Sequence, residues 1–467
     1  MIAIHIFKKK QVALFGLGGS GIATAKALMA GGAIIHAWDD NEASRIKAIE
    51  HGIAVIDLSN SDWSKFKALV LAPGVPLTHP TPHWVVTKAQ EAGVEIIGDM
   101  ELFARERAKS MPNAPVIAIT GTNGKSTTTA LIAHLLKIAG RDVQMGGNIG
   151  VPVLELEPFN ETRIYVLEIS TFQIDLAPSL KPSVGMLLNL TPDHIDRHGT
   201  FEHYAGIKER LIQGSDMAII AQDDATCRMI TLRKNEMNLP MVAISATQTL
   251  EQGIFADGSA IMLGRGERVA QIADIAGIGS LRGTHNAQNV AAAIAAVSLQ
   301  GVDAATIQKG LTSFPGLEHR MEEIGHLGRT LFINDSKATN ADSTDKALSA
   351  FENGVFWIVG GKAKEGGIES LAPLFSHVEK AYLIGEAGEA FAAILEGKVP
   401  FERSETLDMA LEHAAIDAVG SKAVEPVVLL SPACASYDQF ANFEARGKRF
   451  RDLCYGLPGF EALLKRN

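Results

Sequence analysis

Short apolar runs alternate along this chain with glycine turns and with longer segments in which apolar residues recur at helical spacing. Residues 11–15 form the first such run, and the pattern predicts a strand there. A glycine turn at 16–21 follows, then a helix over 22–30 and a second strand over 33–38. This succession predicts a βαβ unit at the start of the chain.

The same alternation continues to the end of the chain and groups into three sheets. Strand-like runs at 68–71 and 94–97 extend the first sheet. A second sheet contains 116–120, 164–169 and 184–188, and a third contains 330–334, 355–359, 381–384 and 426–430. We therefore predict an α/β chain of three domains, each a mostly parallel sheet with flanking helices. They comprise a Rossmann-like domain over 1–111, a P-loop-type domain over 112–313 and a Rossmann-like domain over 314–467.

Composition and charge narrow the range of partners. The chain has 467 residues, which exceeds what one core usually supports, and its 46% hydrophobic and 21% charged residues are typical of globular proteins. A formal net charge of −10 argues against binding to nucleic acid or to an anionic membrane. Three cysteines without CxxC spacing favour a reducing compartment, and no run reaches the length of a membrane helix. We expect a cytoplasmic monomer that holds small substrates in pockets.

Residues 116–129 carry the strongest chemical signal. An apolar run there ends in a loop that contains Gly121 and Gly124, and Lys125 and Ser126 open the helical segment that follows. Backbone N–H groups of such a loop surround phosphate oxygens, the lysine adds a positive charge, and the serine hydroxyl reaches a magnesium ion. Ile119 stands where the usual P-loop has its first glycine, so this loop is a shortened form. The segment predicts binding of Mg-ATP.

The glycine turn at 16–21 matches the GxGxxG pattern, with Asp39 at the end of the next strand. Any ligand with a pyrophosphate and a ribose suits that geometry, so NAD and a UDP-sugar are both admissible. A tight turn without a ligand is the third alternative. The pattern alone leaves the three open.

A metal site is predicted beside the ATP loop. Glu168 ends an apolar run, and His194 follows another. Hard carboxylate ligands near a triphosphate favour magnesium, although His194, His198 and His203 leave zinc conceivable. We expect His198 and His203 to lie on the surface.

Three polar loops follow strands of the third domain, at 333–340, 360–367 and 431–440. Because the carboxyl ends of parallel strands share one edge of a sheet, we expect these loops to converge and to hold a small zwitterion. Arg320 lies just after the domain boundary, where it can stabilise charge on ATP phosphates.

Taken together, these segments resemble the ATP-dependent Mur ligases of peptidoglycan synthesis. Residues 121–127 are shared across that family, shortened loop included, whereas 334–340 and 431–436 resemble the branch that adds D-glutamate. The resemblance covers all three domains. It implies an amide ligase that uses ATP to join D-glutamate to UDP-N-acetylmuramoyl-L-alanine through an acyl phosphate. Departures are Asp40, the Lys-Ala-Lys sequence at 362–364 and Tyr437.

The resemblance also implies a role for individual residues. ATP would contact Gly121, Thr122, Asn123, Gly124, Lys125, Ser126, Thr127, Asn289, Arg320 and Asp335. The catalytic group would comprise Lys125, Glu168, His194 and Lys208, with two magnesium ions held by Ser126, Glu168, His194 and a carbamate on Lys208. The UDP substrate would contact Gly19, Ser20, Asp39, Asp40 and Asn148, and D-glutamate would contact Lys337, Thr339, Lys364, Ser436 and Phe443.

Other interpretations of the chain remain to be tested against the structure. Without the resemblance, Lys208 is best interpreted as a solvated helix lysine that pairs with Glu209 or Asp193. An NAD-dependent oxidoreductase would use the turn at 16–21 but leaves the Lys125 loop unexplained. A nucleotide-binding switch protein and a ligase for a different amino acid are further alternatives.

Overall fold

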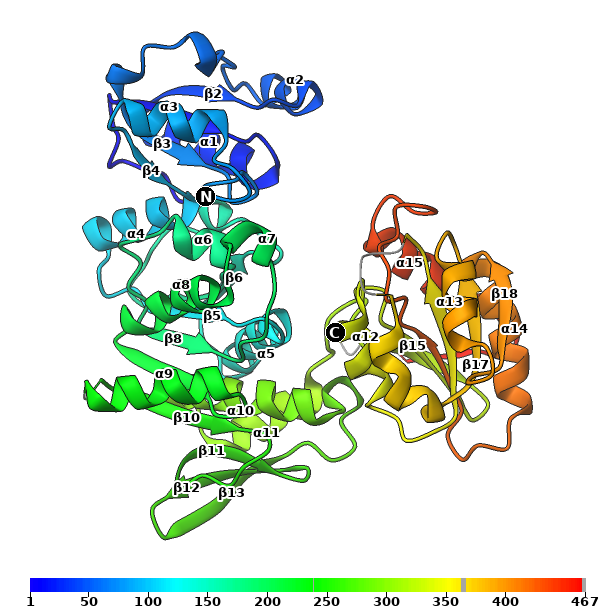
Figure 1. The fold of residues 1–467 in the computed structure, drawn as a ribbon. Helices are drawn as coiled ribbons and strands as arrows, with labels where there is room; N and C mark the ends of the chain where they lie inside the picture. The colour runs from blue at the N-terminus through cyan, green and yellow to red at the C-terminus, as the bar shows by residue number, and fades with distance from the viewer. Residues whose placement is uncertain (238, 363–366, 464–467) are drawn as a thin grey trace. The chain divides into compact units, whose positions relative to one another are not determined.

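The computed structural model describes residues 1–237, 239–362 and 367–463. By their internal contacts they form two compact units. The first unit comprises Met1–Asp274 and Gln288–Leu311, and the second comprises Ile275–Ala287 and Thr312–Asn467. The first unit contains two sheets and the second contains one (Figure 1). The domain boundaries expected near 111 and 313 stay predictions.

The first sheet has four parallel strands in the order β2-β1-β3-β4. Its strands and helices are β1 (Gln11–Phe15), α1 (Gly19–Ala30), β2 (Ile34–Trp38), α2 (Glu42–Glu50), β3 (Phe66–Leu71), α3 (Trp84–Glu91), β4 (Glu95–Ile97) and α4 (Asp99–Ser110). The βαβ unit predicted at the start of the chain is present, with β1 in the middle of the sheet and its last four residues buried.

The second sheet of the first unit has nine strands in the order β13-β12-β11-β10-β9-β8-β5-β7-β6. Its strands are β5 (Val116–Thr120), β6 (Val143–Gly147), β7 (Ile164–Glu168), β8 (Val184–Leu187), β9 (Met217–Ala221), β10 (Met241–Ser245), β11 (Gln252–Asp257), β12 (Ala260–Arg265) and β13 (Arg268–Asp274). The accompanying helices are α5 (Lys125–Ile138), α6 (Thr171–Asp175), α7 (Ile195–His198), α8 (Phe201–Gln213), α9 (Ala225–Glu236), α10 (Thr284–Leu299) and α11 (Ala304–Ser313). All pairs from β6 to β11 are parallel, and β12 and β13 extend the sheet as an antiparallel meander.

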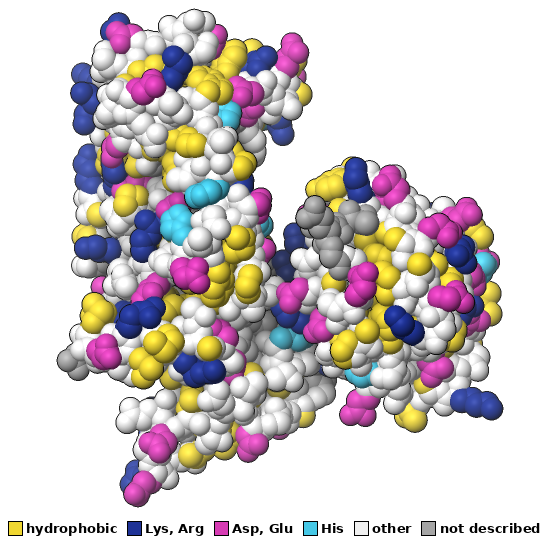
Figure 2. All heavy atoms as spheres, in the orientation of Figure 1, with side chains coloured by type: hydrophobic (Ala, Val, Ile, Leu, Met, Phe, Trp, Pro, Cys, Tyr) yellow, Lys and Arg dark blue, Asp and Glu magenta, His cyan; other side chains and the backbone are white. Residues whose placement is uncertain are grey.

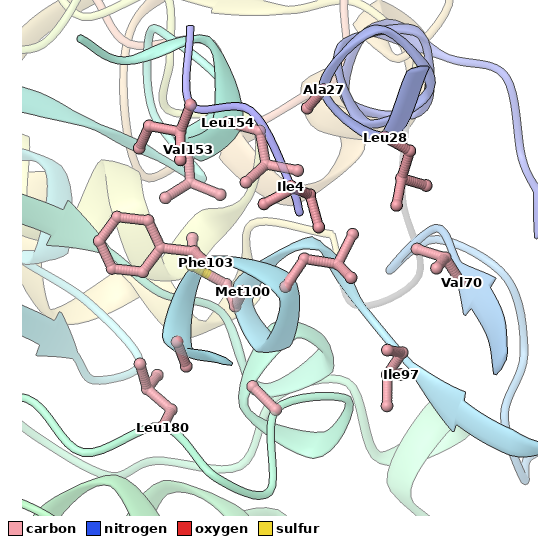
Figure 3. Close-up of a cluster of buried hydrophobic side chains, with 14 of the residues drawn as sticks. Ile4, Ala27, Leu28, Val70, Ile97, Met100, Phe103, Val153, Leu154 and Leu180 are labelled. Carbon is pink, nitrogen blue, oxygen red and sulfur yellow. The ribbon is translucent and has the colours of Figure 1, made fainter. Parts of the chain in front are cut away.

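One hydrophobic cluster joins the two sheets of the first unit (Figure 3). Ile4, Leu28 and Val70, from the N-terminal part, pack in the same cluster as Val153 and Leu154, which lie between β6 and β7. The backbone N–H of Ile2 also donates to the carbonyl of Leu154 at 2.8 Å. Burial of this shared apolar surface explains why residues 1–110 and the nine-stranded sheet form one compact unit.

The sheet of the second unit has seven strands in the order β18-β17-β16-β19-β15-β14-β20. Its elements are β14 (Glu322–Leu327), β15 (Thr330–Asn334), α12 (Ala341–Leu348), β16 (Val355–Gly360), β17 (Val378–Ile384), α13 (Gly388–Leu395), β18 (Phe401–Glu405), α14 (Leu407–Gly420), β19 (Val427–Leu430), α15 (Phe443–Tyr455) and β20 (Glu461–Ala462). The five strands from β18 to β15 are parallel, while β14 and β20 pair antiparallel at one edge.

The predicted α/β class, with mostly parallel sheets and flanking helices, is confirmed. On the face drawn in Figure 2, basic and acidic side chains are interspersed over both units. None of the described helices combines the length and the apolar composition that crossing a lipid bilayer requires.

Candidate active site

The predicted phosphate loop lies between β5 and α5. All five residues of β5 are buried, and α5 begins at Lys125 after Gly124, whose φ of +82° suits glycine. A Cβ added at Gly124 would lie 2.3 Å from Oδ1 of Asn289, so a side chain would displace that buried amide. Gly124 makes no side-chain cap hydrogen bond, and the start of a helix is a place where backbone N–H groups and the helix dipole favour an anion.

Hydrogen bonds from the segment after β8 hold the loop in place. The N–H of Thr122 donates to the carbonyl of Asn189 at 2.9 Å, and the Thr122 hydroxyl lies 2.9 Å from the Tyr204 hydroxyl. Lys125 Nζ donates to the carbonyls of Gly121 and Thr122 at 2.9 and 2.8 Å. These hydrogen bonds organise the loop, and Lys125 folds back over it.

Glu168 is positioned next to the loop by sheet register. It ends β7 and pairs with Ile119 of β5, and its side chain is buried. Oε1 accepts a hydrogen bond from Asn148 Nδ2 at 2.8 Å, whereas Oε2 is buried and has no hydrogen-bond partner among the described residues. A buried carboxylate oxygen without a donor is costly unless a cation neutralises it. The hard oxygen donors of Glu168 and Ser126 therefore fit a magnesium ion.

Lys208, on α8, contacts the start of the phosphate loop from the protein interior. Its side chain is 2% exposed, and Nζ donates to the Gly121 carbonyl at 2.7 Å and to the Thr120 hydroxyl at 3.1 Å. The interpretation as a solvated helix lysine paired with Glu209 or Asp193 is wrong, because Lys208 is buried and bonds the loop, while Glu209 pairs with Arg233 at 2.6 Å and Asp193 lies beside His194. Burial, followed by the charge of Lys125, holds the pKa of Lys208 well below its usual range.

The segment after β8 places three histidines differently. His194 is exposed and adopts φ +52°, with Nε2 3.6 Å from Asp193. The expectation that His198 lies on the surface is wrong: it is buried, stacks on Phe172 at 5.1 Å, and Nε2 lies 2.9 Å from the Thr171 hydroxyl. Burial lowers its pKa to about 4.

His203 is exposed, as expected. Among the residues that the structure describes, no three His, Cys, Asp or Glu side chains are grouped as ligands for one metal ion.

The glycine turn of the first sheet exposes the start of α1. Gly18 and Gly19 are exposed, and a Cβ at either would meet nothing within 4 Å. Asp39 closes the turn, since its carboxylate accepts from the N–H of Leu17 at 2.6 Å and of Asn41 at 2.8 Å. The open, uncapped helix start fits a phosphate group.

The neighbouring carboxylate faces two aromatic side chains. Asp40 lies 3.1 Å from His83 Nε2 and 3.3 Å from Trp84 Nε1. The ring nitrogens of His83 and Trp84 therefore hold the Asp40 carboxylate in place.

The three loops predicted to converge in the second unit do follow adjacent strands. Asn334 at the end of β15 pairs with Leu430 of β19, and Leu430 also pairs with Ile358 of β16. Backbone hydrogen bonds of 3.0 and 2.9 Å join Gly360 and Lys362 of the second loop to Pro432 and Ala435 of the third. Sheet register thus places the three loops at one edge.

Two charged residues organise this edge. Asp335 is buried, which raises its pKa to about 7, and it accepts a hydrogen bond from the Ser431 hydroxyl at 2.9 Å. Arg320 lies between His319 and Met321, whose φ values of +62° and +44° are rare for residues with side chains. This backbone geometry sets the direction in which the Arg320 side chain projects from the backbone.

The residues predicted for D-glutamate lie close to these loops. Lys337 Nζ is 3.8 Å from the ring centre of Phe443, a cation–π contact at the start of α15. Ser436 is buried and Thr339 is half-buried. Lys364 lies outside the described residues.

Arg446 connects two of these loops and was not predicted from the sequence. It is 1% exposed and donates to the backbone of Ser336 and Cys434 at 2.9 and 3.0 Å and to the Ser336 hydroxyl at 3.0 Å. Burial lowers its pKa to about 10. Its place on the buried stripe of α15, with Phe450 and Cys454, was a signal available in the sequence.

A phosphate loop before a helix, a buried carboxylate on the neighbouring strand, a second glycine turn at a helix start and a sheet edge of polar loops are the features of an α/β enzyme that uses a nucleoside triphosphate. The chain belongs to the Mur ligase family. Residues 119–297 match the family described as Mur ligase middle domain, and residues 319–434 match the Mur ligase, glutamate ligase domain.

Curated relatives cover nearly the whole chain. A protein of Brucella abortus (strain 2308) is 60% identical over 459 residues, which is 98% of each chain, and one of Mesorhizobium japonicum is 57% identical over 463 residues, 99% of each. Both are named UDP-N-acetylmuramoylalanine--D-glutamate ligase. The resemblance on which the residue assignments depend is therefore confirmed at the level of the family.

Solved structures show the same fold at low identity. UDP-N-acetylmuramate-alanine ligase MurC from Thermotoga maritima has a TM-score of 0.59 at 18% identity, covering 95% of this chain and 99% of that one. The MurF ligase from Thermotoga maritima, determined in complex with ADP, has a TM-score of 0.56 at 18% identity, with 97% and 96% covered. At such identity the likeness establishes the fold alone.

Proposed function

We propose that this chain is an ATP-dependent amide ligase that adds D-glutamate to UDP-N-acetylmuramoyl-L-alanine and releases ADP and phosphate, in cytoplasmic synthesis of peptidoglycan precursors. The observation that carries the proposal is the identity of 56–60% with relatives of that name over 98–99% of this chain. The phosphate loop, the buried Glu168 and the loops around Lys337 supply groups that such a reaction needs.

The chemistry proceeds in two displacements. A carboxylate oxygen of the alanyl substrate attacks the γ-phosphorus, the bond to the bridging oxygen breaks, and ADP leaves. The amine of D-glutamate then attacks the acyl carbon, the tetrahedral intermediate expels phosphate, and the amine loses a proton. An anionic carboxylate approaching a triphosphate is repelled, so Lys125 and the N–H groups at the start of α5 act by stabilising charge on the phosphate oxygens.

Magnesium fits the residues beside the loop. We assign Ser126, Glu168, His194 and a carbamate on Lys208 as the groups that would hold it, and the unpartnered Oε2 of Glu168 supports this assignment. When bound, magnesium supplies positive charge to the phosphates.

The remaining assignments extend over the rest of the molecule. We assign Gly19, Ser20, Asp39, Asp40 and Asn148 to the UDP substrate, with Asp39 acting through the turn that it closes. ATP is assigned to residues 121–127 and to Asn289 in the first unit, and to Arg320 and Asp335 in the second. D-glutamate is assigned to Lys337, Thr339, Lys364, Ser436 and Phe443, which offer positive charge, hydroxyl groups and one ring.

Phosphate release tests the proposed function directly. We expect release from ATP to require both UDP-N-acetylmuramoyl-L-alanine and D-glutamate, and to be much slower when L-glutamate, L-alanine or diaminopimelate replaces D-glutamate. Equal release with ATP alone would favour the switch protein. Preference for another amino acid would identify a different ligase, and an absorbance change with NAD(H) would favour the oxidoreductase.

Lys337→Ala is expected to raise the KM for D-glutamate about 10- to 100-fold, because hydrogen bonds to charged groups contribute about 1.5–3 kcal/mol. The KM for ATP should stay within about threefold of the parent. Lys398→Ala, which removes an exposed lysine of the same unit, is the matched control. Initial rates at varied D-glutamate measure the effect, and an unchanged KM and kcat in Lys337→Ala would remove this residue from the site.

A further inference from the structure

A relay of three hydrogen-bonded polar side chains in the first unit, Asn189, Gln288 and Asp223, ends on the phosphate loop; Gln288 is buried and the other two are half-buried. Asn189, just after β8, grips the backbone of Asn123 from both sides: its Oδ1 accepts from the Asn123 N–H at 2.8 Å, and its Nδ2 donates to the Asn123 carbonyl at 3.1 Å. The orientation of this one amide therefore determines whether both bonds can form.

Gln288 and Asp223 continue the relay away from the loop. Asn189 Nδ2 also donates to Oε1 of Gln288 at 3.2 Å, and Gln288 Nε2 donates to Oδ2 of Asp223 at 2.5 Å. Gln288 is 8% exposed and lies on α10, whereas Asp223 follows β9. The other oxygen of Asp223 accepts from the Ser245 hydroxyl at 2.6 Å and from the N–H of Thr247 at 3.1 Å.

The charge of Asp223 determines which group donates and which accepts in each hydrogen bond of the relay. Burial acts to raise the pKa of Asp223, but hydrogen bonds from Ser245, Gln288 and Thr247 outweigh it and hold the pKa below its usual range. An ionised carboxylate only accepts hydrogen bonds. Gln288 must therefore turn its NH₂ toward Asp223 and its oxygen toward Asn189, and Asn189 must in turn direct its NH₂ to Gln288.

We propose that Asp223 and Gln288 are positioning residues that fix the conformation of the phosphate loop by setting the orientation of the Asn189 amide. Reversal of Asn189 would face its NH₂ to the Asn123 N–H and its oxygen to the Gln288 oxygen, and both pairs repel. The next residue on α10, Asn289, accepts from the Thr128 hydroxyl at 3.2 Å and lies against Gly124. Gln288, through Asn189, and Asn289 thus both support the end of the loop that leads into α5.

The inference rests on the proposed role of this loop in binding ATP, and a charge exchange tests it. Asp223→Asn removes the obligate acceptor, and Gln288→Glu places a second carboxylate against Asp223. Each single variant is expected to raise the Kd for ATP and for ADP at least tenfold. In the double variant, the carboxylate at position 288 accepts from Asn189 and from the new amide at position 223, whose oxygen still accepts from Ser245. Its Kd should return to within about threefold of the parent.

Isothermal titration with ATP and ADP is the measurement, with Thr231→Val as the matched control. Thr231 accepts a buried hydrogen bond of 2.6 Å from Gln222, the neighbour of Asp223, and has no hydrogen bond to the relay residues among the described bonds. We expect that control to bind nucleotide like the parent. Because titration does not require turnover, a parent that binds ATP but fails to ligate D-glutamate would reject the proposed function and leave the relay measurable.

The proposal is overturned if the single variants bind nucleotide with the Kd of the parent. It is also overturned if the Kd of the double variant is as high as that of the weaker-binding single variant. Should Asp223→Asn fail to fold, the comparison of Gln288→Glu with the double variant still decides, because a merely structural role predicts no recovery. The KM for D-glutamate provides a second readout, since positioning of the phosphate loop leaves it within about threefold of the parent in every folded variant.

Discussion

Lys208→Ala is expected to lose nearly all ligase activity, with kcat at least about 10³-fold lower, which corresponds to about 4 kcal/mol in the barrier. Lys208 and Lys125 both donate to the carbonyl of Gly121, so two lysine side chains share one acceptor. Burial and this neighbouring charge favour the neutral amine of Lys208. A neutral amine attacks carbon dioxide, an N–C bond forms, one proton leaves, and the product is an anionic carbamate.

Carbamylation would replace a neutral amine, which is a poor ligand for magnesium, by an anionic oxygen donor of the kind that magnesium prefers. The parent should therefore lose activity in buffer depleted of carbon dioxide and regain it on addition of bicarbonate, while acetate should partly restore Lys208→Ala. Lys234→Ala is the matched control, because Lys234 is also buried and lies on the neighbouring helix α9. A fully active Lys208→Ala enzyme in depleted buffer would refute the carbamate.

The parts of the fold that the sequence predicted well are those set by local pattern. β5 is buried in all its residues and lies between β7 and β8, so it appears in the sequence as an uninterrupted apolar run. Its abrupt end at the glycine loop then marks the phosphate site. Glu168 follows the same logic, since it closes a buried strand that pairs with β5. To predict the phosphate loop and Glu168, it is enough to recognise a buried strand and the residue at which it ends.

Burial of polar residues was harder to predict, although α8 carried a signal. Tyr204, Ile207, Lys208 and Leu211 share its buried face, which places the lysine on an apolar stripe at helical spacing. His198 was predicted on the surface and is buried, because its ring stacks on Phe172 of another helix. A contact of that kind depends on the tertiary fold and leaves no periodic mark in the sequence.

Long-range polar contacts could not be predicted from spacing. Asn189 and Gln288 are 99 positions apart, yet their amides are hydrogen-bonded beside the phosphate loop. Arg446 bonds Ser336 across 110 positions. To predict either contact, one must first know which strand ends are neighbours in the sheet. The antiparallel edge strand β13 was not predicted, because it is largely exposed and lacks an apolar run.

Lys125→Ala is expected to lower kcat/KM for ATP by at least about 10³-fold, since a cation on transferring phosphate contributes several kcal/mol. Nζ of Lys125 lies over the loop and donates to two of its carbonyls, so its removal also loosens the loop that it bridges. Binding of the uridine substrate should change less than threefold, because four of the five residues assigned to it, Gly19, Ser20, Asp39 and Asp40, lie beside the first sheet. Lys137→Ala on the exposed last turn of the same helix is the matched control and should retain activity. Initial rates at varied ATP, with titration of the uridine substrate in parallel, make the measurement. If Lys125→Ala turned over ATP like Lys137→Ala, the segment 121–127 would not be the phosphate site.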